Sequence, residues 1–333
     1  MSRNDELRLI LFFIDIIFYF CISFFCKIKK HMSNTAKYYI ESLRLRTLPL
    51  SLSGVVLGGL LPIAAGYCKI GVFVWAILTA LSLQILSNLS NELGDLQKGT
   101  DNENRLGPIR TVQSGKLTEK NMIGMMLIFV GLSVYFGLAL VWVAFDDLLS
   151  TQALIMLTCG VFAIAASIKY TFGGHAYGYV GLGDLFVFLF FGLVSVCGVY
   201  YLSTSQLPLK IFLPAASIGL MSTAVLNVNN MRDIENDADF EKKTMAVRMG
   251  LKRAKIYHFS LIVFPFLLMT IFSFMQNGNL WKFLYLLSLP LFVFHLNFVI
   301  KNEGRSLDKQ MKVQSLGTLL FACLSGIGMI LSV

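Results

Sequence analysis

Nine stretches of the sequence are long and apolar enough to cross a lipid bilayer. A transmembrane helix needs about 20 predominantly apolar residues, and polar connections separate these stretches along the chain. The stretches lie near residues 49–66, 72–90, 121–143, 151–168, 180–201, 211–230, 256–276, 280–300 and 315–333. Because no soluble domain separates them, the pattern predicts an all-α membrane protein whose residues 32–333 form one domain with nine transmembrane helices.

The composition excludes a soluble globular protein. Of the 333 residues, 56% are hydrophobic and only 14% are charged, and the mean hydropathy is +0.70. A soluble domain usually carries about 25% charged residues, so this chain has too few to cover a water-facing surface of its size. We therefore expect an integral membrane protein in contact with membrane lipid.

The first 31 residues form a separate apolar extension. Residues 9–26 are apolar enough to insert into a bilayer, and residues 27–31 are mostly basic. The stretch is too long for a secretory signal peptide and lacks the small-residue cleavage site. Two interpretations stay open: a tenth helix, or a mis-assigned start that precedes an alternative one at Met32.

The connections between the apolar stretches alternate in charge. Connections 91–120, 169–179, 231–255 and 301–314 are basic or long, whereas those between them are short and nearly free of Lys and Arg. Basic loops of membrane proteins face the cytoplasm. We therefore expect a multi-pass protein of the cell (inner) membrane, with these four connections on the cytoplasmic side. Topology then accounts for most of the net charge of +9, without a nucleic-acid partner.

The second and sixth apolar stretches each run into a segment of amide and carboxylate residues with the same spacing. The residues at positions i, i+3 and i+7 are Asn88, Asn91 and Asp95 in the first segment and Asn230, Asp233 and Asp237 in the second. On a helix this spacing places all three side chains on one face. Such a set of oxygens suits Mg²⁺, which binds a few carboxylates and completes its shell with water and phosphates.

Basic residues accompany both acidic segments. They are Lys98, Arg105, Arg110, Arg232, Lys242 and Arg248. A diphosphate would need such cations beside a metal site. The alternative is that all these groups are ordinary solvated charges at helix ends, but polar residues at membrane depth are costly and usually functional.

A third polar segment, rich in glycine and tyrosine, leads into the fifth apolar stretch. It contains Lys169, Tyr170, Tyr177, Tyr179 and Asp184 among several glycines. Tyrosine rings can stabilise a cation through their quadrupole, although an interfacial aromatic belt would have the same composition. Asp184 lies just inside an apolar stretch, which favours a functional role for its carboxylate.

These segments resemble the UbiA-type intramembrane aromatic prenyltransferases. The likeness rests on Asn-x-x-Asn-x-x-x-Asp at residues 88–95 and on the stretches 98–101, 105–110, 177–184 and 229–237, four of which are similar to the branch that acts on 1,4-dihydroxy-2-naphthoate. It covers roughly residues 37–333. The resemblance implies a nine-helix UbiA-type bundle around a central cavity, a Mg²⁺ cofactor, a polyprenyl diphosphate donor and the naphthoate as acceptor, and we infer no protein partner.

The sequence departs from the family pattern at three positions. Glu92 follows Asn91 where the family usually has Asp, and its longer side chain could still reach a metal. Gly99 stands where the wider superfamily has a third acid, which here is Asp101. Asn230 stands where members of other branches often have Asp.

The residue chemistry and the resemblance together imply roles for the site residues in electrophilic aromatic substitution. The expected metal ligands are Asn91, Glu92, Asp95, Asp233 and Asp237. The expected catalytic residues are Asp95, Asp233, Asp237, Tyr170 and Asp184. The expected substrate-binding residues are Asn88, Lys98, Asp101, Arg105, Arg110, Lys169, Tyr177, Tyr179, Asn227, Asn230, Arg232, Lys242 and Arg248.

Two other functions compete with this interpretation. A related prenyltransferase could act on another acceptor, such as 4-hydroxybenzoate or haem. A cation-coupled transporter would also place acids in a membrane protein, but near the bilayer midplane at broken helices. The clustering of the acids at helix ends, beside basic residues, disfavours transport.

Overall fold

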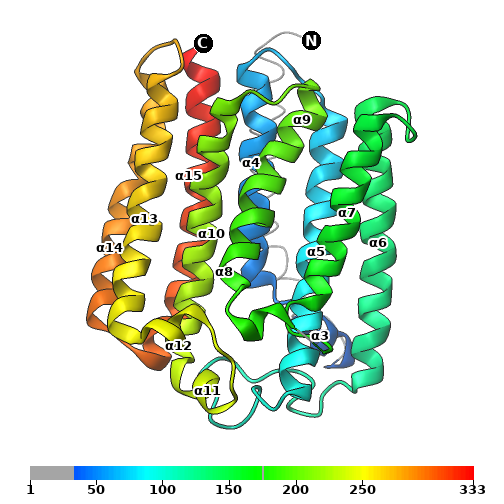
Figure 1. Cartoon of the computed structure of the whole chain (residues 1–333), viewed down its shortest axis with the longest axis vertical. Coiled ribbons are helices and arrows are strands. Elements are labelled where there is room, and N and C mark those ends of the chain that lie inside the picture. The colour runs from blue at the N-terminus through cyan, green and yellow to red at the C-terminus, as the bar shows by residue number, and fades with distance from the viewer. Residues whose placement is uncertain (1–33, 175) are drawn as a thin grey trace.

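A computed structural model describes residues 34–174 and 176–333, and these residues form helices and connections without any strand (Figure 1). The predicted extension 1–31 lies outside the described residues. The long α-helices are α4 Leu48–Ala64, α5 Ile70–Gln97, α6 Glu119–Phe145, α7 Thr151–Lys169, α10 Phe212–Arg232, α13 Leu251–Phe274, α14 Leu289–Lys301 and α15 Asp308–Ser332. The shorter elements are α3 Asn34–Ser42, α8 Gly183–Val187, α9 Gly198–Thr204, α11 Ile234–Asp239 and α12 Met245–Met249, the π-helix η4 Phe188–Cys197, and the 3-10 helices η2 Leu45–Thr47, η3 Tyr177–Val180, η5 Leu209–Ile211, η6 Leu280–Ser288 and η7 Gly304–Leu307.

Nine helical segments of the described chain are long and apolar enough to cross a membrane, which confirms the predicted number of spans. The second span is longer than expected, because α5 continues through the acidic segment to Gln97. The fifth span combines α8, η4 and α9 into one continuous segment, Gly183–Thr204. The chain is therefore an all-α integral membrane protein.

The spans stand side by side in a single bundle (Figure 1). Helix α5 packs against α4 and α6, α15 packs against α4 and α10, and α10 also packs against α13 and η4. The connections 98–118 and 233–250 lie at the same end of the bundle, at the bottom of Figure 1, and the C-terminus lies at the other end. We call the end that carries these two connections the polar end.

The π-helix η4 packs closely on the first span. A Cβ atom on Gly54 would lie only 2.5 Å from the carbonyl oxygen of Phe191, so the two backbones can approach only because residue 54 is glycine. A π-helical turn is rare and is often found at functional sites. Phe190, Phe191, Val194 and Ser195 of this segment line the internal cavity described below.

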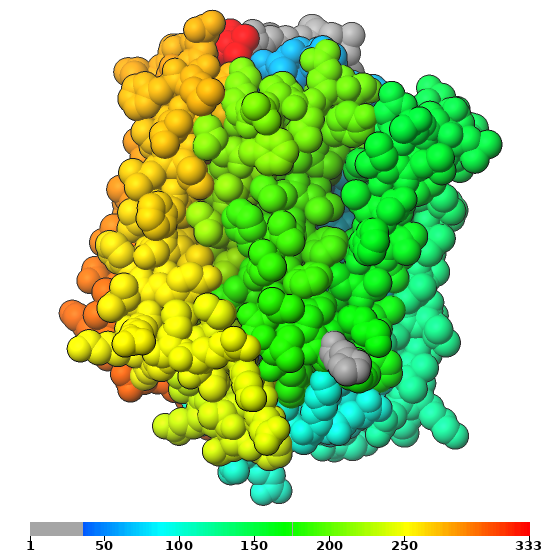
Figure 2. All heavy atoms as spheres, viewed as in Figure 1, coloured from blue at the N-terminus to red at the C-terminus, as the bar shows by residue number. Residues whose placement is uncertain are grey.

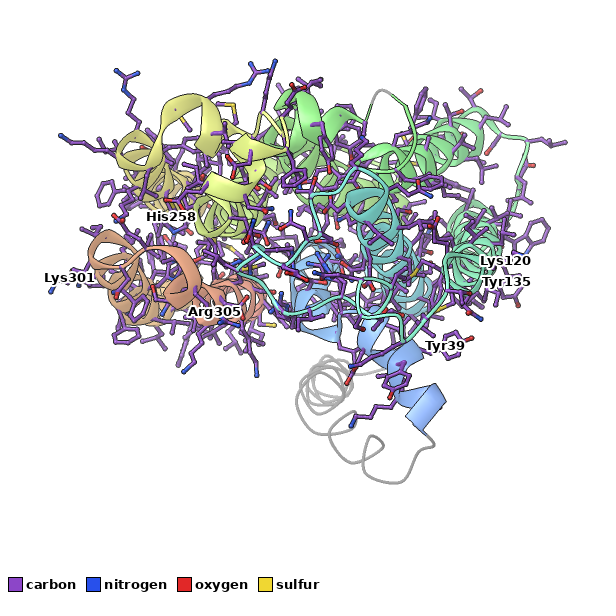
Figure 3. All side chains as sticks on the ribbon, turned by 90° about the horizontal axis from the view of Figure 1, so that it is seen from below. Tyr39, Lys120, Tyr135, His258, Lys301 and Arg305 are labelled. Atoms are coloured by element: carbon purple, nitrogen blue, oxygen red, sulfur yellow. The ribbon has the colours of Figure 1, made fainter. Side chains whose placement is uncertain are left out.

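The two connections of the polar end touch each other. In Figure 2 they project side by side below the bundle, and in the end-on view of Figure 3 the connection 98–118 runs across its middle. The side-chain amide of Asn236 donates to the carbonyl oxygen of Thr100 at 2.9 Å, and the amide of Asn102 donates to the side-chain oxygen of Asn236 at 3.0 Å. These contacts bring together two segments about 135 residues apart, and with them the two acidic segments.

Candidate active site

A cavity of about 490 Å³ extends from the polar end into the bundle. Residues of α4, α5, α6, α7, α10 and the fifth span line it. Asn91, Asp95, Arg110 and Lys242 contribute charged and amide groups, whereas most of the other lining residues are apolar or aromatic. The cavity can therefore hold a molecule with a charged head and a long apolar tail.

The first acidic segment lies on one face of α5, as its spacing predicted. Asn88, Asn91 and Asp95 all line the cavity. The amide of Asn88 donates to the carbonyl oxygen of Leu43 at 2.9 Å, and the side-chain oxygen of Asn91 accepts from the Thr171 hydroxyl at 3.2 Å. Neighbouring elements therefore hold the amide side chains in place.

The carboxylate of Asp95 is held by a tyrosine and a lysine. The hydroxyl of Tyr179 donates to Asp95 Oδ1 at 2.8 Å, and Lys242 Nζ lies 3.3 Å from the same atom. The ammonium of Lys98 lies 3.9 Å from the centre of the Tyr179 ring, on its face. Burial raises the pKa of the Tyr179 hydroxyl, and the neighbouring Asp95 raises it further, so this group stays a hydrogen-bond donor.

Lys242 connects the two acidic segments. Its ammonium lies 3.3 Å from Asp95 Oδ1 and 3.8 Å from Asp237 Oδ1, and its side chain is buried. Burial alone would lower the pKa of Lys242, but the charges of Asp95 and Asp237 raise it above the usual value. A positive charge therefore already lies between a carboxylate of each segment.

The carboxylate of Asp237 is only partly satisfied beside Lys242. Burial raises the pKa of Asp237 to about 6, even though Lys242 opposes the shift. Its Oδ2 atom is buried and has no hydrogen-bond partner among the described residues. In the part of the chain that the structure describes, no three His, Cys, Asp or Glu side chains lie close enough together to bind a metal. An amide or phosphate ligand would thus have to join the two carboxylates.

The second acidic segment does not form the single helical stripe that we expected. Helix α10 ends at Arg232, Asp233 is non-helical with φ −101° and ψ 18°, and Asp237 lies on the separate short helix α11. Within α10 itself, Asn229 lines the cavity and Asn230 does not. The prediction of one face for Asn230, Asp233 and Asp237 was therefore wrong.

Asp233 is bound by the residue that precedes it. Arg232 donates from Nε to Asp233 Oδ1 at 3.0 Å and from a terminal nitrogen to Oδ2 at 2.5 Å. Burial raises the pKa of Asp233, but these two bonds and the Arg232 charge outweigh it, so the pKa lies below its usual value. The carboxylate of Asp233 is therefore ionised.

Two of the predicted tyrosines form an aromatic wall of the cavity. The rings of Tyr170 and Tyr177 are 5.3 Å apart in an edge-to-face arrangement, and Tyr177 stacks on Phe186 at 4.1 Å. Phe190 continues this wall, 6.1 Å from Phe186. Burial raises the pKa of both tyrosines, so they stay uncharged and offer their ring faces to a cation.

Seven of the residues predicted from the sequence line the cavity. They are Asn88, Asn91, Asp95, Arg110, Tyr170, Tyr177 and Lys242. Six others lie outside the lining, and ion pairs, hydrogen bonds or a ring contact link them to the lining residues or to each other: Lys98, Asp101, Arg105, Tyr179, Asp233 and Asp237. Arg232 also lies outside the lining and binds Asp233. Lys169 and Asn230 are likewise outside it.

The remaining predicted residues bind other parts of the fold instead of the cavity. Glu92 accepts from the hydroxyl of Thr111 and the backbone N–H of Val112, which fixes the first connection to α5. The other three are Asp184, which accepts from the Tyr257 hydroxyl at 3.0 Å, Asn227, which donates to the Ala254 carbonyl oxygen at 3.1 Å, and Arg248, which donates to the Val180 carbonyl oxygen at 2.9 Å. In this arrangement these four side chains hold neighbouring parts of the fold together.

Among the polar lining residues that the sequence analysis missed, Arg44 and Asn229 stand out. Arg44 precedes the first span in a left-handed backbone conformation, with φ 53°. Its Nε atom is buried without a hydrogen-bond partner among the described residues. Such a backbone is uncommon for a residue other than glycine and often marks a functional site. In the sequence, Arg44 reads only as part of the basic flank that orients the first span.

The chain is similar to known prenyltransferases over most of its length. The profile of the UbiA prenyltransferase family matches residues 51–321. The 1,4-dihydroxy-2-naphthoate octaprenyltransferase of Escherichia coli is 39% identical over 88% of this chain and 95% of its own length, and that of Haemophilus influenzae is 38% identical over 91% and 99%. The structure of a UbiA homolog from Archaeoglobus fulgidus bound to DMAPP and Mg²⁺ has the same fold, with a TM-score of 0.55 and 14% identity over 87% of this chain and 99% of its own.

Proposed function

Because the chain belongs to the UbiA prenyltransferase family, we propose that it transfers a polyprenyl group from its diphosphate to 1,4-dihydroxy-2-naphthoate. The acceptor loses its carboxylate, and the product is the reduced (quinol) form of demethylmenaquinone, an intermediate of menaquinone biosynthesis. The observation that carries this proposal is the sequence similarity to two 1,4-dihydroxy-2-naphthoate octaprenyltransferases, which are 39% and 38% identical over 88% and 91% of this chain. The cavity supports it, since its charged mouth and apolar interior match a prenyl diphosphate.

We place the Mg²⁺ cofactor at the carboxylates of the polar end. Asp95 and Asp237 would hold it, with Asp233 and Asn91 within the same group of residues. When bound there, the ion would neutralise the diphosphate and make it a better leaving group. The UbiA homolog from A. fulgidus, which shares the fold, was solved bound to DMAPP and Mg²⁺, which supports a Mg²⁺ cofactor.

The chain's own cations would hold the diphosphate. Lys242 and Arg110 line the mouth of the cavity, and Arg105 lies next to Arg110 on the same carboxylate, Asp101. Tyr179 keeps Asp95 turned toward Lys242. When the diphosphate leaves, these positive groups retain it and the prenyl chain becomes an allylic cation.

The apolar part of the cavity would protect this cation from water, which would otherwise quench it. The ring faces of Tyr170 and Tyr177 offer electrostatic stabilisation. The naphthoate ring then attacks with its electron-rich carbon. The carboxylate leaves that carbon as CO₂, and the electron pair of the broken bond restores the aromatic ring, so the carbon needs no base.

Arg44 would bind the carboxylate of the acceptor. Its guanidinium lines the cavity, and among the described residues it forms no ion pair. The Arg44 side chain is half-buried and its buried Nε atom has no hydrogen-bond partner among the described residues, so an anion bound beside it would be favourable. The acceptor supplies such an anion, whereas the diphosphate has Lys242 and Arg110.

We also propose that the polar end faces the cytoplasm of a cell (inner) membrane, because its connections carry most of the loop Lys and Arg residues. Residues 32–333 would carry the whole activity, since the family match begins at residue 51, after Met32. A chain that starts at Met32 should insert and turn over like the full chain. A stable but inactive product would contradict this part of the proposal.

The acceptor is tested by offering 1,4-dihydroxy-2-naphthoate and 4-hydroxybenzoate together with one polyprenyl diphosphate and following product mass. We expect prenylated naphthoquinol, with one CO₂ released per molecule formed. Membranes that contain the Asp95→Ala variant serve as the inactive control. Prenylated 4-hydroxybenzoate with its carboxylate retained, as the main product, would contradict the acceptor but not the family.

A further inference from the structure

Arg232 is a fully buried residue whose five N–H groups all have acceptors. It is only 1% exposed. Nε and one terminal nitrogen bind both oxygens of Asp233, and the same terminal nitrogen donates to Asn229 Oδ1 at 3.0 Å. The other terminal nitrogen donates to Asp308 Oδ1 at 2.5 Å and lies 3.1 Å from the sulfur of Met311. The guanidinium therefore has one fixed orientation.

Asp308 is the only acceptor in this set that comes from another span and carries a charge. It lies in the first turn of α15, the last span, 75 residues after Asp233. Arg46, at the start of the first span, also binds it, with a terminal nitrogen 3.3 Å from both carboxylate oxygens. Arg46, Asp308, Arg232 and Asp233 thus form a chain of alternating charges that joins three spans.

This chain lies directly behind the cavity. Asn229 and Met311, which both contact the Arg232 guanidinium, line the cavity. If Asp308 were removed, Asp233 would be the only carboxylate left to balance a buried guanidinium. A tighter Arg232–Asp233 pair would make the Asp233 carboxylate less available to a cation, and the unbalanced charge would repel that cation.

We propose that Asp308 is a positioning residue for the second acidic segment. It shares the charge of Arg232 and fixes its orientation, so that Asn229 and Asp233 keep the arrangement needed for Mg²⁺ and diphosphate. Asp308 does not itself contact the cavity. The N-cap residue of α15 is Leu307 and not Asp308, so capping does not explain the contacts of Asp308 with Arg46 and Arg232. This inference rests on the proposed function, because it assumes a metal diphosphate at the polar end.

The test compares Asp308→Ala with wild type in a binding measurement that needs no turnover. Purified full-length protein in detergent is heated with increasing Mg²⁺ in the presence of farnesyl S-thiolodiphosphate, a donor analogue that resists ionisation. Removal of a residue that orients metal ligands typically weakens metal binding by about tenfold or more. We expect Asp308→Ala to raise the Mg²⁺ concentration for half-maximal thermal stabilisation by about tenfold, and Asp308→Glu to recover part of the loss.

Two control variants separate positioning from general damage. Glu303→Ala removes an acid of the adjacent connection that pairs with Lys255 at 2.9 Å, and it should leave the Mg²⁺ titration unchanged. Arg46→Gln removes the partly exposed partner of Asp308 and leaves Arg232 held, so it should shift the titration less than about threefold. The double variant Arg46→Gln/Asp308→Ala keeps the network neutral and should retain the defect of Asp308→Ala.

The possible results have distinct meanings. If wild type gains no stability from Mg²⁺ and the analogue, the proposed function fails. If wild type responds and a folded Asp308→Ala protein titrates like it, the positioning role is overturned. The role is also overturned if the neutral double variant binds Mg²⁺ like wild type. It is overturned as well if the double variant does not fold, because Asp308 would then serve stability alone.

Discussion

The two acidic segments have the same spacing but different structures. In the first, α5 continues to Gln97, so Asn88, Asn91 and Asp95 share one face and line the cavity. In the second, α10 stops at Arg232, and Asp237 comes from a separate short helix. Matching i, i+3, i+7 patterns therefore place side chains on one face only where the helix continues through them.

Packing and pairing account for this difference. Next to Asp95, a Cβ atom on Gly94 would lie 2.6 Å from the Thr171 carbonyl oxygen, so α5 passes close to the third segment as an intact helix. In the second segment, Arg232 binds the side chain of the next residue, Asp233, and the chain turns there. After this turn, Asp237 lies 3.8 Å from the ammonium of Lys242, which also contacts Asp95 at 3.3 Å.

The largest effect is expected from the carboxylates that Lys242 connects. If each segment supplies one metal ligand, Asp95→Ala and Asp237→Ala should each lower turnover by at least about 10²-fold, because several kcal/mol of charge stabilisation are lost. EDTA should abolish the activity of wild type and Mg²⁺ should restore it. Asp239→Ala, at an exposed position of α11, is the matched control. Turnover that persists in EDTA, or full activity of either variant, would contradict the shared site.

A smaller and more selective effect is expected from Arg44, which has no counterpart beside the second segment. Arg44→Gln should raise the half-saturating acceptor concentration by about tenfold and leave that of the donor nearly unchanged, since a hydrogen bond to a charged group is lost. Steady-state kinetics with each substrate varied in turn measures both values. Arg46→Gln controls for the loss of a neighbouring charge. An equal rise for donor and acceptor would assign Arg44 to the diphosphate instead.

Variants of two adjacent asparagines test which face of α10 is turned toward the cavity. Asn229 lines the cavity and Asn230 does not. Asn229→Ala should raise the half-saturating donor concentration by about fivefold, as expected for one lost hydrogen bond, and Asn230→Ala should change it less. Thermal unfolding of both variants shows whether either loss reflects stability. A larger kinetic effect at Asn230 would restore the continuous stripe predicted from the spacing.

The smallest effect is expected at Glu92, which follows Asn91 on α5 but binds the first connection. Glu92→Gln keeps the oxygen that accepts from Thr111 and Val112, so turnover should stay within about threefold of wild type. Glu92→Ala leaves two buried donors unpaired and should lower the free energy of unfolding by about 1–3 kcal/mol. Loss of Mg²⁺-dependent turnover in Glu92→Gln, with normal thermal stability, would mean that its charge binds the metal.

The spans and the first acidic segment could be predicted because both depend on local properties. The length of an apolar stretch and the periodicity of a helix are visible in any short window of sequence. Asn88, Asn91 and Asp95 follow from that periodicity alone. Asn229 and Arg44 could not be found in this way, because Asn229 reaches the cavity through the packing of α10 in the bundle, and Arg44 lies in a left-handed backbone conformation.

The sequence by itself determined that this is a nine-span membrane protein with two amide and carboxylate segments at the same end of its bundle. Only the tertiary structure decided which of those groups face each other. Lys242 lies between Asp95 and Asp237, and Asp308 of the last span holds Arg232 behind the cavity. Contacts between residues 76 and 147 positions apart leave no local pattern, since they depend on how whole helices pack.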